Sequence, residues 1–535
     1  MTTPAHEKRW TRRVSVAAAA STALVTLAAC GGSTSNSGNG NDGTLAIGMA
    51  SDTLSLDPTS CAPPTYCFPA YDSLVHQTSA GKYAADLATS WKFLGSGHQT
   101  LRLTLRQGTH FTDGTELDAQ AVVASMDNFL KTPGPNQSNA VPVDKVTASG
   151  KYSVDVHYST PVTYDFALWQ LSGQNGLGTI VGPKGLANPK SLNTTSDGIG
   201  PYKLDAAATL KGSVYTYVPN RAYFNQSAIK YSKITLKPMQ NARSRLSAVE
   251  SGQIDWAQAI PATDVDTAES SGLRISTGKL GAAPDGMPML VLAQRNTGPL
   301  ANVKVRQAIS YAIPRTQIAK AVYGSSATPT SSMVPAGAQG YNEADTNLYP
   351  YDKTKAKQLL AEAGYPNGFT LTVFDPTVFD ANNTLGQALV SALAAIDIKV
   401  NLVSSDASAG TVSQQVGSGK YPAYVWNAGA TGTFSLAKVN FSAGAYMNPF
   451  KVATDPTLEK LVKQAGLAAT QSEQNTLMKA ATARLDELEW AVPVASVPTL
   501  QATRKDITNV PSSYLTRELD PFSPVTSENW SPANG

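Results

Sequence analysis

Short apolar strands alternate with amphipathic helices through most of the C-terminal half of this 535-residue chain. The stretch 351–369, YDKTKAKQLLAEAGYPNGF, predicts a helix that Asp352 caps and Gly364 ends, and its last residue opens a predicted strand, FTLTV. A helix at 384–396 and a strand at 398–403 repeat the pattern. Alternation of this kind favours helices layered on a sheet, so the predicted fold class is α/β.

The same signals place elements elsewhere in the chain. The leucines of 100–105, TLRLTL, alternate with polar residues, which is the period of a strand with one buried face. Asp118 is expected to cap the helix that follows. Asp455 and the proline after it predict a further helix start, and 473–489 predicts a long helix.

The N-terminus has the composition of a bacterial export signal. Four basic residues precede an apolar and small-residue stretch at 14–27. This stretch is too short to span a bilayer as a lasting helix but has the length of a signal-peptide core. Residues 27–30, Leu-Ala-Ala-Cys, resemble a lipobox, which implies that 1–29 is a lipoprotein signal peptide and Cys30 a lipid anchor. An ordinary signal peptide with a chance cysteine is the alternative.

Residues 30–43 contain, after Cys30, only Gly, Ser, Asn, Thr and Asp. Such a segment buries nothing, stays flexible and spans roughly 20 Å on average. We interpret it as a tether that holds a folded body at the outer face of the bacterial cell membrane. The Arg12-Arg13 pair leaves open whether export uses the general secretion or the twin-arginine route.

Charge and length limit the function classes. Residues 1–29 hold four of the 42 Lys and Arg and one of the 39 Asp and Glu, so the rest of the chain has 38 of each and is formally neutral. No basic field indicates nucleic-acid binding.

A body of about 490 residues exceeds one typical core, so two or three domains are expected. No apolar run after Cys30 reaches the ~18 residues of a membrane span.

Cys61 and Cys67 are the remaining cysteines, with two prolines between them. Outside the cell a close pair of this kind is most simply a disulfide. Free thiols and a metal site are the alternatives, but a metal site needs further ligands, so no metal or other cofactor is expected. The histidines of the body show no local grouping: His76, His98, His110 and His157.

Several stretches together carry a resemblance to a known family. LTLRQGTHFTDGTELDAQAVVAS is similar to its signature of a strand, LR-x-G, x-F-x-DG-T and a helix. GIGPYKL, VPNRAYF, AVESGQIDWA, VKVRQAISYAIPR and EWAVPV follow in order. These segments resemble the extracellular solute-binding proteins of peptide-type ABC importers, which include oligopeptide-, dipeptide- and nickel-binding proteins. Most motif residues, such as Arg106 and Arg306, suit turns, caps and salt bridges better than ligand contacts.

The resemblance covers nearly all of 44–535 and implies a periplasmic-binding-protein-like type II fold. Two lobes and a small extra domain would then close around a ligand. Lobe I would comprise 44–58, 191–280 and 498–535. The extra domain would be 59–190, and lobe II would be 281–497.

The stretch 421–434, YPAYVWNAGATGTF, bears most directly on the ligand. In peptide-binding members of the family a strand here ends in an aromatic residue, followed by an aspartate that pairs with the peptide's free amine. In this chain Trp426 and Asn427 are followed by Gly429 at the position of that aspartate. A buried ammonium needs a paired charge, so either the usual amine anchor is absent or another acid replaces it. Asp285 is a candidate, although it also suits an ordinary turn before glycine.

The other candidate ligand contacts are aromatic residues and methionines. Trp426 could stack on a ligand ring or fill the lobe interface, and Tyr424 would point to the same side of a strand. Asn427 offers both a donor and an acceptor. Thioethers on the lobe crossing would suit a permissive pocket, although any of these side chains could equally belong to the core. The remaining candidates are Met287, Met289, Tyr66, Phe68 and Tyr71.

The function that the resemblance implies is a lipid-anchored receptor that captures a ligand between its lobes and delivers it to the permease of an ABC importer. The expected ligand is an oligopeptide, with an oligosaccharide or another non-peptide solute as the alternative. An enzyme is not expected, because the chain has no H-E-x-x-H or G-x-S-x-G motif and no triad can be assembled from scattered histidines. A ligand sensor without transport is the third hypothesis.

Overall fold

The computed structural model of the protein describes residues 43–533, except 54, 133–139, 141, 280–285, 381–382, 408, 429–431 and 446. Cys30, the signal peptide and the tether up to residue 42 lie outside the described residues, as do Asp285 and Gly429. Residues Asp42–Gly535 make up one compact unit. None of the described helices combines the length and the apolar character needed to cross a membrane.

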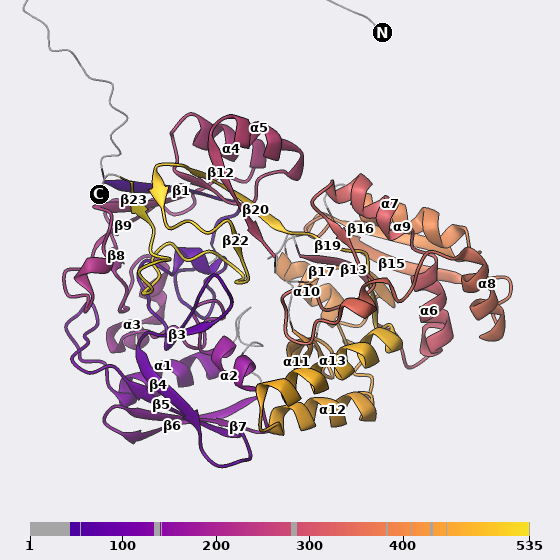
Figure 1. Ribbon diagram of the computed structural model, residues 1–535, viewed down its shortest axis with the longest axis horizontal. Helices are drawn as coiled ribbons and strands as arrows, with labels where there is room; N and C mark the ends of the chain where they lie inside the picture. Colours follow the sequence, from indigo (N-terminus) through magenta and orange to yellow (C-terminus); the bar gives the residue numbers. More distant parts are fainter. Residues whose placement is uncertain are drawn as a thin grey trace, which may run out of the picture. The chain divides into compact units, whose positions relative to one another are not determined.

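The largest sheet has eight strands and draws them from the beginning, the middle and the end of the chain (Figure 1). Its centre is parallel, because β1 (Thr44–Met49) pairs with β10 (Lys233–Pro238) on one side and β11 (Trp256–Ala257) on the other. Beyond β10 follow β9 (Tyr215–Pro219) and β8 (Tyr202–Leu204), and beyond β11 follow β20 (Thr499–Arg504), β12 (Leu273–Gly278) and β22 (Ser513–Tyr514).

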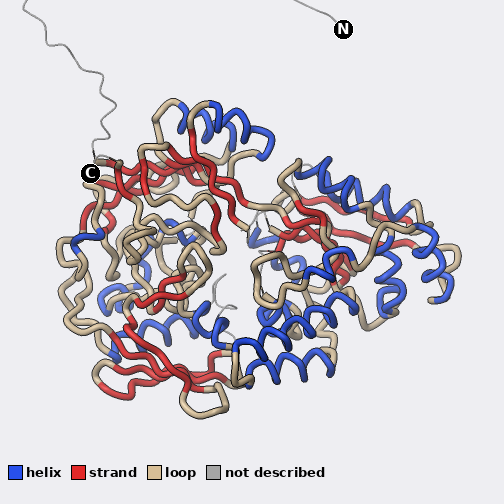
Figure 2. Tube along the Cα trace, viewed as in Figure 1, coloured by secondary structure: helices blue, strands red, loops and turns tan. Residues whose placement is uncertain are grey.

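A second sheet has five strands, in the order β16 (Lys399–Ser405), β15 (Thr370–Pro376), β17 (Ala423–Ala428), β13 (Met287–Leu292) and β18 (Ala491–Pro493). β15 is parallel to both of its neighbours, and β13 is antiparallel to both of its own. Figure 2 shows helices beside this sheet. Among them, α6 (Val303–Tyr311) packs on α8 (Lys353–Glu362), and α9 (Thr384–Ala394) packs on β16.

A third sheet has four antiparallel strands, in the order β4 (Ala88–Phe93), β5 (Thr100–Leu105), β7 (Ser153–Tyr158) and β6 (Val143–Gly150). The helix α1 (Ala119–Lys131) packs on it, and β2 (Val75–Gln77) pairs with β3 (Tyr83–Ala85) nearby in the chain. We call the parts built on the eight-, five- and four-stranded sheets the first lobe, the second lobe and the extra domain. The exact residue boundaries between them stay a prediction.

Further helices and short strands lie between and after the strands of the three sheets. The remaining helices are α2 (Tyr164–Gln170), α3 (Pro183–Ala187), α4 (Ala242–Glu250), α5 (Val265–Ser270), α7 (Arg315–Ile318), α10 (Ala409–Gly417), α11 (Thr433–Ser435), α12 (Pro456–Leu467) and α13 (Gln471–Leu488). Two pairs of short strands complete the described structure: β14 (Thr328–Pro329) with β19 (Ala495–Ser496), and β21 (Ile507–Thr508) with β23 (Ser531–Pro532).

The helix caps predicted from the sequence are confirmed. The carboxylates of Asp118, Asp352 and Asp455 each accept a hydrogen bond from a backbone N–H in the first turn of their helices. Gly364 follows α8 with a φ of 89°, the left-handed conformation expected of it. The long C-terminal helix begins earlier than predicted, because Thr470 caps it.

Candidate functional site

Trp426 lies on β17 with its ring half-buried beside two other aromatic rings. The ring centroid of Phe379, from the loop after β15, is 4.3 Å from that of Trp426, and the ring of Tyr424 meets it edge-on at 6.0 Å. Tyr424 and Trp426 therefore share one face of the strand, as the period of two predicts. Because Tyr424 is fully buried, the Trp426 ring is the part of this pair that solvent can reach.

Asn427 points to the opposite face of β17, since successive strand residues alternate. Its side chain is 5% exposed, and its Oδ1 accepts no hydrogen bond from the described part of the chain. Across the sheet, Met289 pairs with Trp426 and Met287 pairs with Ala428. Both methionines are 1% exposed, so they belong to the core, and ligand contact by either stays a prediction.

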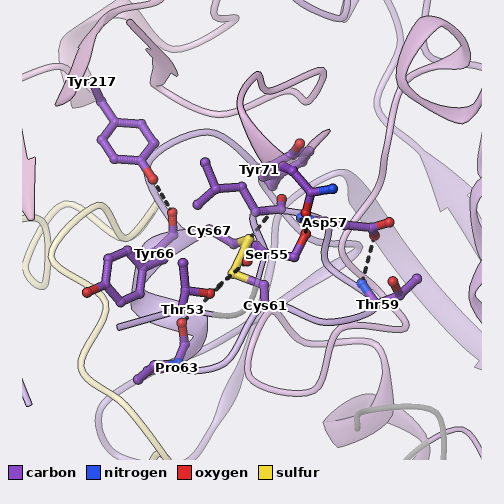
Figure 3. The surroundings of a disulfide bond; sticks show 12 residues. Thr53, Ser55, Asp57, Thr59, Cys61, Pro63, Tyr66, Cys67, Tyr71 and Tyr217 are labelled. Atoms are coloured by element: carbon purple, nitrogen blue, oxygen red, sulfur yellow. Dashed lines mark hydrogen bonds between the residues drawn. A yellow bond between two sulfur atoms is a disulfide. The ribbon is translucent and has the colours of Figure 1, made fainter. Parts of the chain in front are cut away.

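The loop that precedes β2 is closed by a disulfide between Cys61 and Cys67 (Figure 3). Tyr66 is fully buried within it, and its hydroxyl donates to the carbonyl of Ser51 at 2.9 Å. The hydroxyl of Tyr217, on β9, donates to the carbonyl of Tyr66. These bonds attach the loop to the first lobe and occupy the polar groups of Tyr66.

Phe68 and Tyr71 are also buried, and both line a small cavity between the extra domain and the C-terminal segment. Asp72 and Asp86 line the same cavity. Burial and the charge of Asp86 raise the pKa of Asp72 well above its usual range. Burial also raises the pKa of Asp86, to about 6.

His76 stands at the edge of this acidic cluster. Burial by itself lowers the pKa of His76, but the carboxylates of Glu528, Asp520 and Asp86 together raise it. Its Nε2 lies 2.9 Å from the hydroxyl of Ser523. His76 therefore joins the extra domain to the last segment of the first lobe, where it meets Asp520, Ser523 and Glu528.

The extra domain also contacts the second lobe. Oδ2 of Asp165, in α2, accepts hydrogen bonds from the side-chain amides of Gln471 at 3.1 Å and Gln339 at 3.4 Å. Beside them the rings of Phe166 and Phe434 lie 4.6 Å apart. No sequence pattern marks these residues, because each partner lies in a different part of the chain.

The motif arginines have the structural role expected of them, although they bond to carbonyls instead of forming salt bridges. The guanidinium of Arg106 donates to the carbonyl of Asp86, and that of Arg306 donates to the carbonyls of Leu488 and Leu300. Among the described residues no group of three or more His, Cys, Asp or Glu side chains could hold a metal ion.

Comparison with known families gives one match that covers most of the chain. The family described as bacterial extracellular solute-binding proteins, family 5 Middle, matches residues 82–445. The glutathione-binding protein GsiB of Salmonella paratyphi A is 30% identical over 327 residues. That alignment spans 58% of this chain and 58% of the relative's length.

Solved structures match over more of the chain at lower identity. AgaA of A. tumefaciens, in complex with agropinic acid, has a TM-score of 0.75 at 23% identity and covers 91% of this chain and 98% of its own. DppA of Helicobacter pylori, in complex with the peptide STSA, has a TM-score of 0.72 at 20% identity with the same coverage. The predicted periplasmic-binding-protein fold is confirmed by these matches.

Proposed function

This chain belongs to the bacterial extracellular solute-binding proteins of family 5, and on that premise we propose that it is the receptor of an ABC importer. It captures a small solute between its two lobes and delivers it to a membrane permease. The family consists of binding proteins and not of enzymes, so no bond is broken. The observation that carries the proposal is the half-exposed ring of Trp426, backed by Phe379, on an otherwise buried strand.

The ligand class that we propose is a short peptide or peptide-like compound. The names and titles of relatives support it: one is a glutathione-binding protein, and another was solved with the peptide STSA. A non-peptide solute is the second candidate. Gly429 favours it, because peptide-binding members carry their amine-binding aspartate at that position, and AgaA was solved with agropinic acid.

The site of action that we propose is the outer face of the cell membrane, with Cys30 lipidated and 31–43 as the tether. The lipobox-like sequence before Cys30 supports this. The intact mass of the membrane-extracted protein should correspond to a chain that begins at Cys30 and carries acyl-glyceryl groups. The variant Cys30→Ala should leave the membrane fraction, and an unmodified wild-type chain with another first residue would overturn the anchor.

Native mass spectrometry of the chain from residue 31, purified gently from its own host, tests the capture of a solute. Residues Asp42–Gly535 form one compact unit, so this chain keeps the whole folded body. Bound masses spaced by amino-acid residues would identify a permissive peptide receptor. Hexose spacing, or one defined non-peptide mass, would identify the second ligand class. A protein that retains no solute from its host or from added extracts would contradict the proposed capture.

A further inference from the structure

The segment 513–520 lies where the first lobe, the second lobe and the extra domain meet. It leaves the eight-stranded sheet at β22, and the backbone N–H of Leu515 then donates to the carbonyl of Ser79 in the extra domain at 2.7 Å. The same leucine touches the second lobe, since a Cβ built on Gly337 would come 2.7 Å from its side chain. The residues that follow Leu515 are therefore presented at a junction of all three parts.

Glu518, three residues after Leu515, is held by hydrogen bonds to the extra domain and to the first lobe. Its N–H donates to Oε1 of Gln174 at 2.8 Å, and its carbonyl accepts from Nε2 of the same side chain at 3.1 Å. Its carboxylate accepts a hydrogen bond at 3.2 Å from Gln258, the residue directly after β11. The carboxyl end of a parallel strand is the edge at which open α/β sheets bind their ligands.

Arg517 stands between these two fixed points with an exposed side chain. Of the arginines that the structure describes, only Arg517 and Arg221 have side chains without a hydrogen bond or an ion pair. The surrounding protein lowers the pKa of Arg517 by desolvation, and the neighbouring Glu518 offsets this only in part. Arg517 therefore presents an exposed guanidinium without a partner in the described part of the chain, at the junction of the three parts.

From this placement we infer that the guanidinium of Arg517 binds a carboxylate of the captured solute. The inference rests on the proposed function. The planar guanidinium offers two parallel N–H donors that match the two oxygens of a carboxylate. A cation that is partly desolvated and has no partner gains most from such a ligand group. The carboxylate could belong to the C-terminus of a peptide or to a sugar-derived acid, which share this chemistry.

Two matched pools of small compounds test the inference. The first holds tripeptides and sugar acids with free carboxylates, and the second holds the same compounds as methyl esters. The chain from residue 31 is incubated with each pool as wild type, Arg517→Gln, Arg517→Lys and the matched control Arg221→Gln. Native mass spectrometry identifies what is retained, and the retained masses distinguish peptides from sugar acids. Calorimetry then gives the affinity of the best-retained compound.

We expect wild type and Arg221→Gln to retain free acids in preference to esters. Arg517→Gln should bind the retained acid about tenfold to hundredfold more weakly, the usual effect of removing a charge-assisted hydrogen bond. The affinity of Arg517→Lys should lie between those of wild type and Arg517→Gln, because an ammonium keeps the charge but cannot form a bidentate hydrogen bond to a carboxylate. The melting temperature should stay unchanged in all three variants, because neither arginine side chain has a partner within the described protein.

Equal affinity of Arg517→Gln and wild type for the acid would overturn the inference and leave the proposed function intact. A wild-type preference for the esters would do the same. A wild-type protein that retains nothing from either pool would instead count against the proposed function, and with it against the inference. These results therefore distinguish a failure of the inference from a failure of the proposed function.

Discussion

The side-chain amide of Gln471, in the first turn of α13, donates a hydrogen bond of 3.1 Å to Oδ2 of Asp165 across 306 residues of sequence. Gln339 donates to the same oxygen at 3.4 Å. One carboxylate of the extra domain thus receives amides from two separate segments of the second lobe. Burial raises the pKa of Asp165, while these two hydrogen bonds oppose that rise.

Replacing Asp165 by alanine should weaken ligand capture without unfolding the protein. The change removes the carboxylate oxygen through which α2 is hydrogen-bonded to the second lobe. Loss of these hydrogen bonds should destabilise the solute-bound conformation by about 1 kcal/mol. The dissociation constant of a retained solute should rise about fivefold, measured by calorimetry. Asp127→Ala is the matched control, because Asp127 forms only an exposed ion pair with Lys131. Unchanged affinity in Asp165→Ala would contradict the prediction.

Removing the disulfide should destabilise the protein at the loop that precedes β2. Cys61 and Cys67 close a short loop, and a cross-link over so few residues restricts the unfolded chain by about 2 kcal/mol. The double variant with serine at both positions should lose about that much free energy of unfolding in urea titrations. Reduction of the wild type should reproduce the loss, and the double variant should not respond to the reductant. If the reductant also destabilised the double variant, its effect on the wild type would not be due to the loss of this disulfide.

Replacing Trp426 by alanine should reduce ligand affinity about tenfold or more, as for other aromatic anchors in binding sites. Its ring is half-exposed, and the ring of Phe379 packs against it. Trp91→Ala is the matched control, because Trp91 is also half-buried but lies on β4 of the extra domain. Similar losses of affinity in both variants would point to general destabilisation and count against a ligand contact at Trp426.

Asp486, in α13, should make stability depend on pH. Its side chain is fully buried and accepts a hydrogen bond from the N–H of Met333 at 3.0 Å. Burial raises the pKa of Asp486 to about 8. The native state therefore holds this proton more tightly than the unfolded chain, where the pKa is about 4. The resulting stabilisation is complete below about pH 4 and is lost as the pH rises to about 8.

The variant Asp486→Asn tests this because its amide oxygen keeps the bond to Met333 and carries no proton to lose. Between pH 5 and pH 8 the wild type should lose more free energy of unfolding than the variant, by a few kcal/mol, since each pKa unit is worth about 1.4 kcal/mol. Urea titrations at the two pH values measure the difference. Asp144→Asn, at an exposed position, should follow the wild type. Parallel curves for Asp486→Asn and wild type would refute the prediction.

Local patterns predicted the parts of the fold that depend on neighbours in sequence. The alternating leucines of 100–105 form β5, and Asp352 and Gly364 mark the two ends of α8 as expected. Ends that depend on an unnoticed cap were missed: Thr470 accepts from the N–H of Glu473, so α13 begins before the predicted residue. Helix propensity and capping depend on a few neighbouring residues, so they can be recognised in the sequence alone.

The candidate site was predictable only in part. The shared face of Tyr424 and Trp426 follows from strand periodicity, and the structure confirms it. The contact of Leu515 with Gly337 and that of Asp165 with Gln471 join segments that are far apart in the sequence. Such contacts are set by how the sheets pack, and no local pattern encodes them.

The central strand of the eight-stranded sheet also sets the order in which this protein can mature. β1 comes first in the described chain, yet its partners β10 and β11 come near the middle, and β11 needs β20 from the last part of the chain. A polypeptide that is delivered N-terminus first, by ribosome or translocon, must keep β1 without partners until much of the chain has followed. The first lobe therefore cannot be completed before the end of delivery, and a truncated chain would present an unfinished sheet to the quality-control proteases of its compartment.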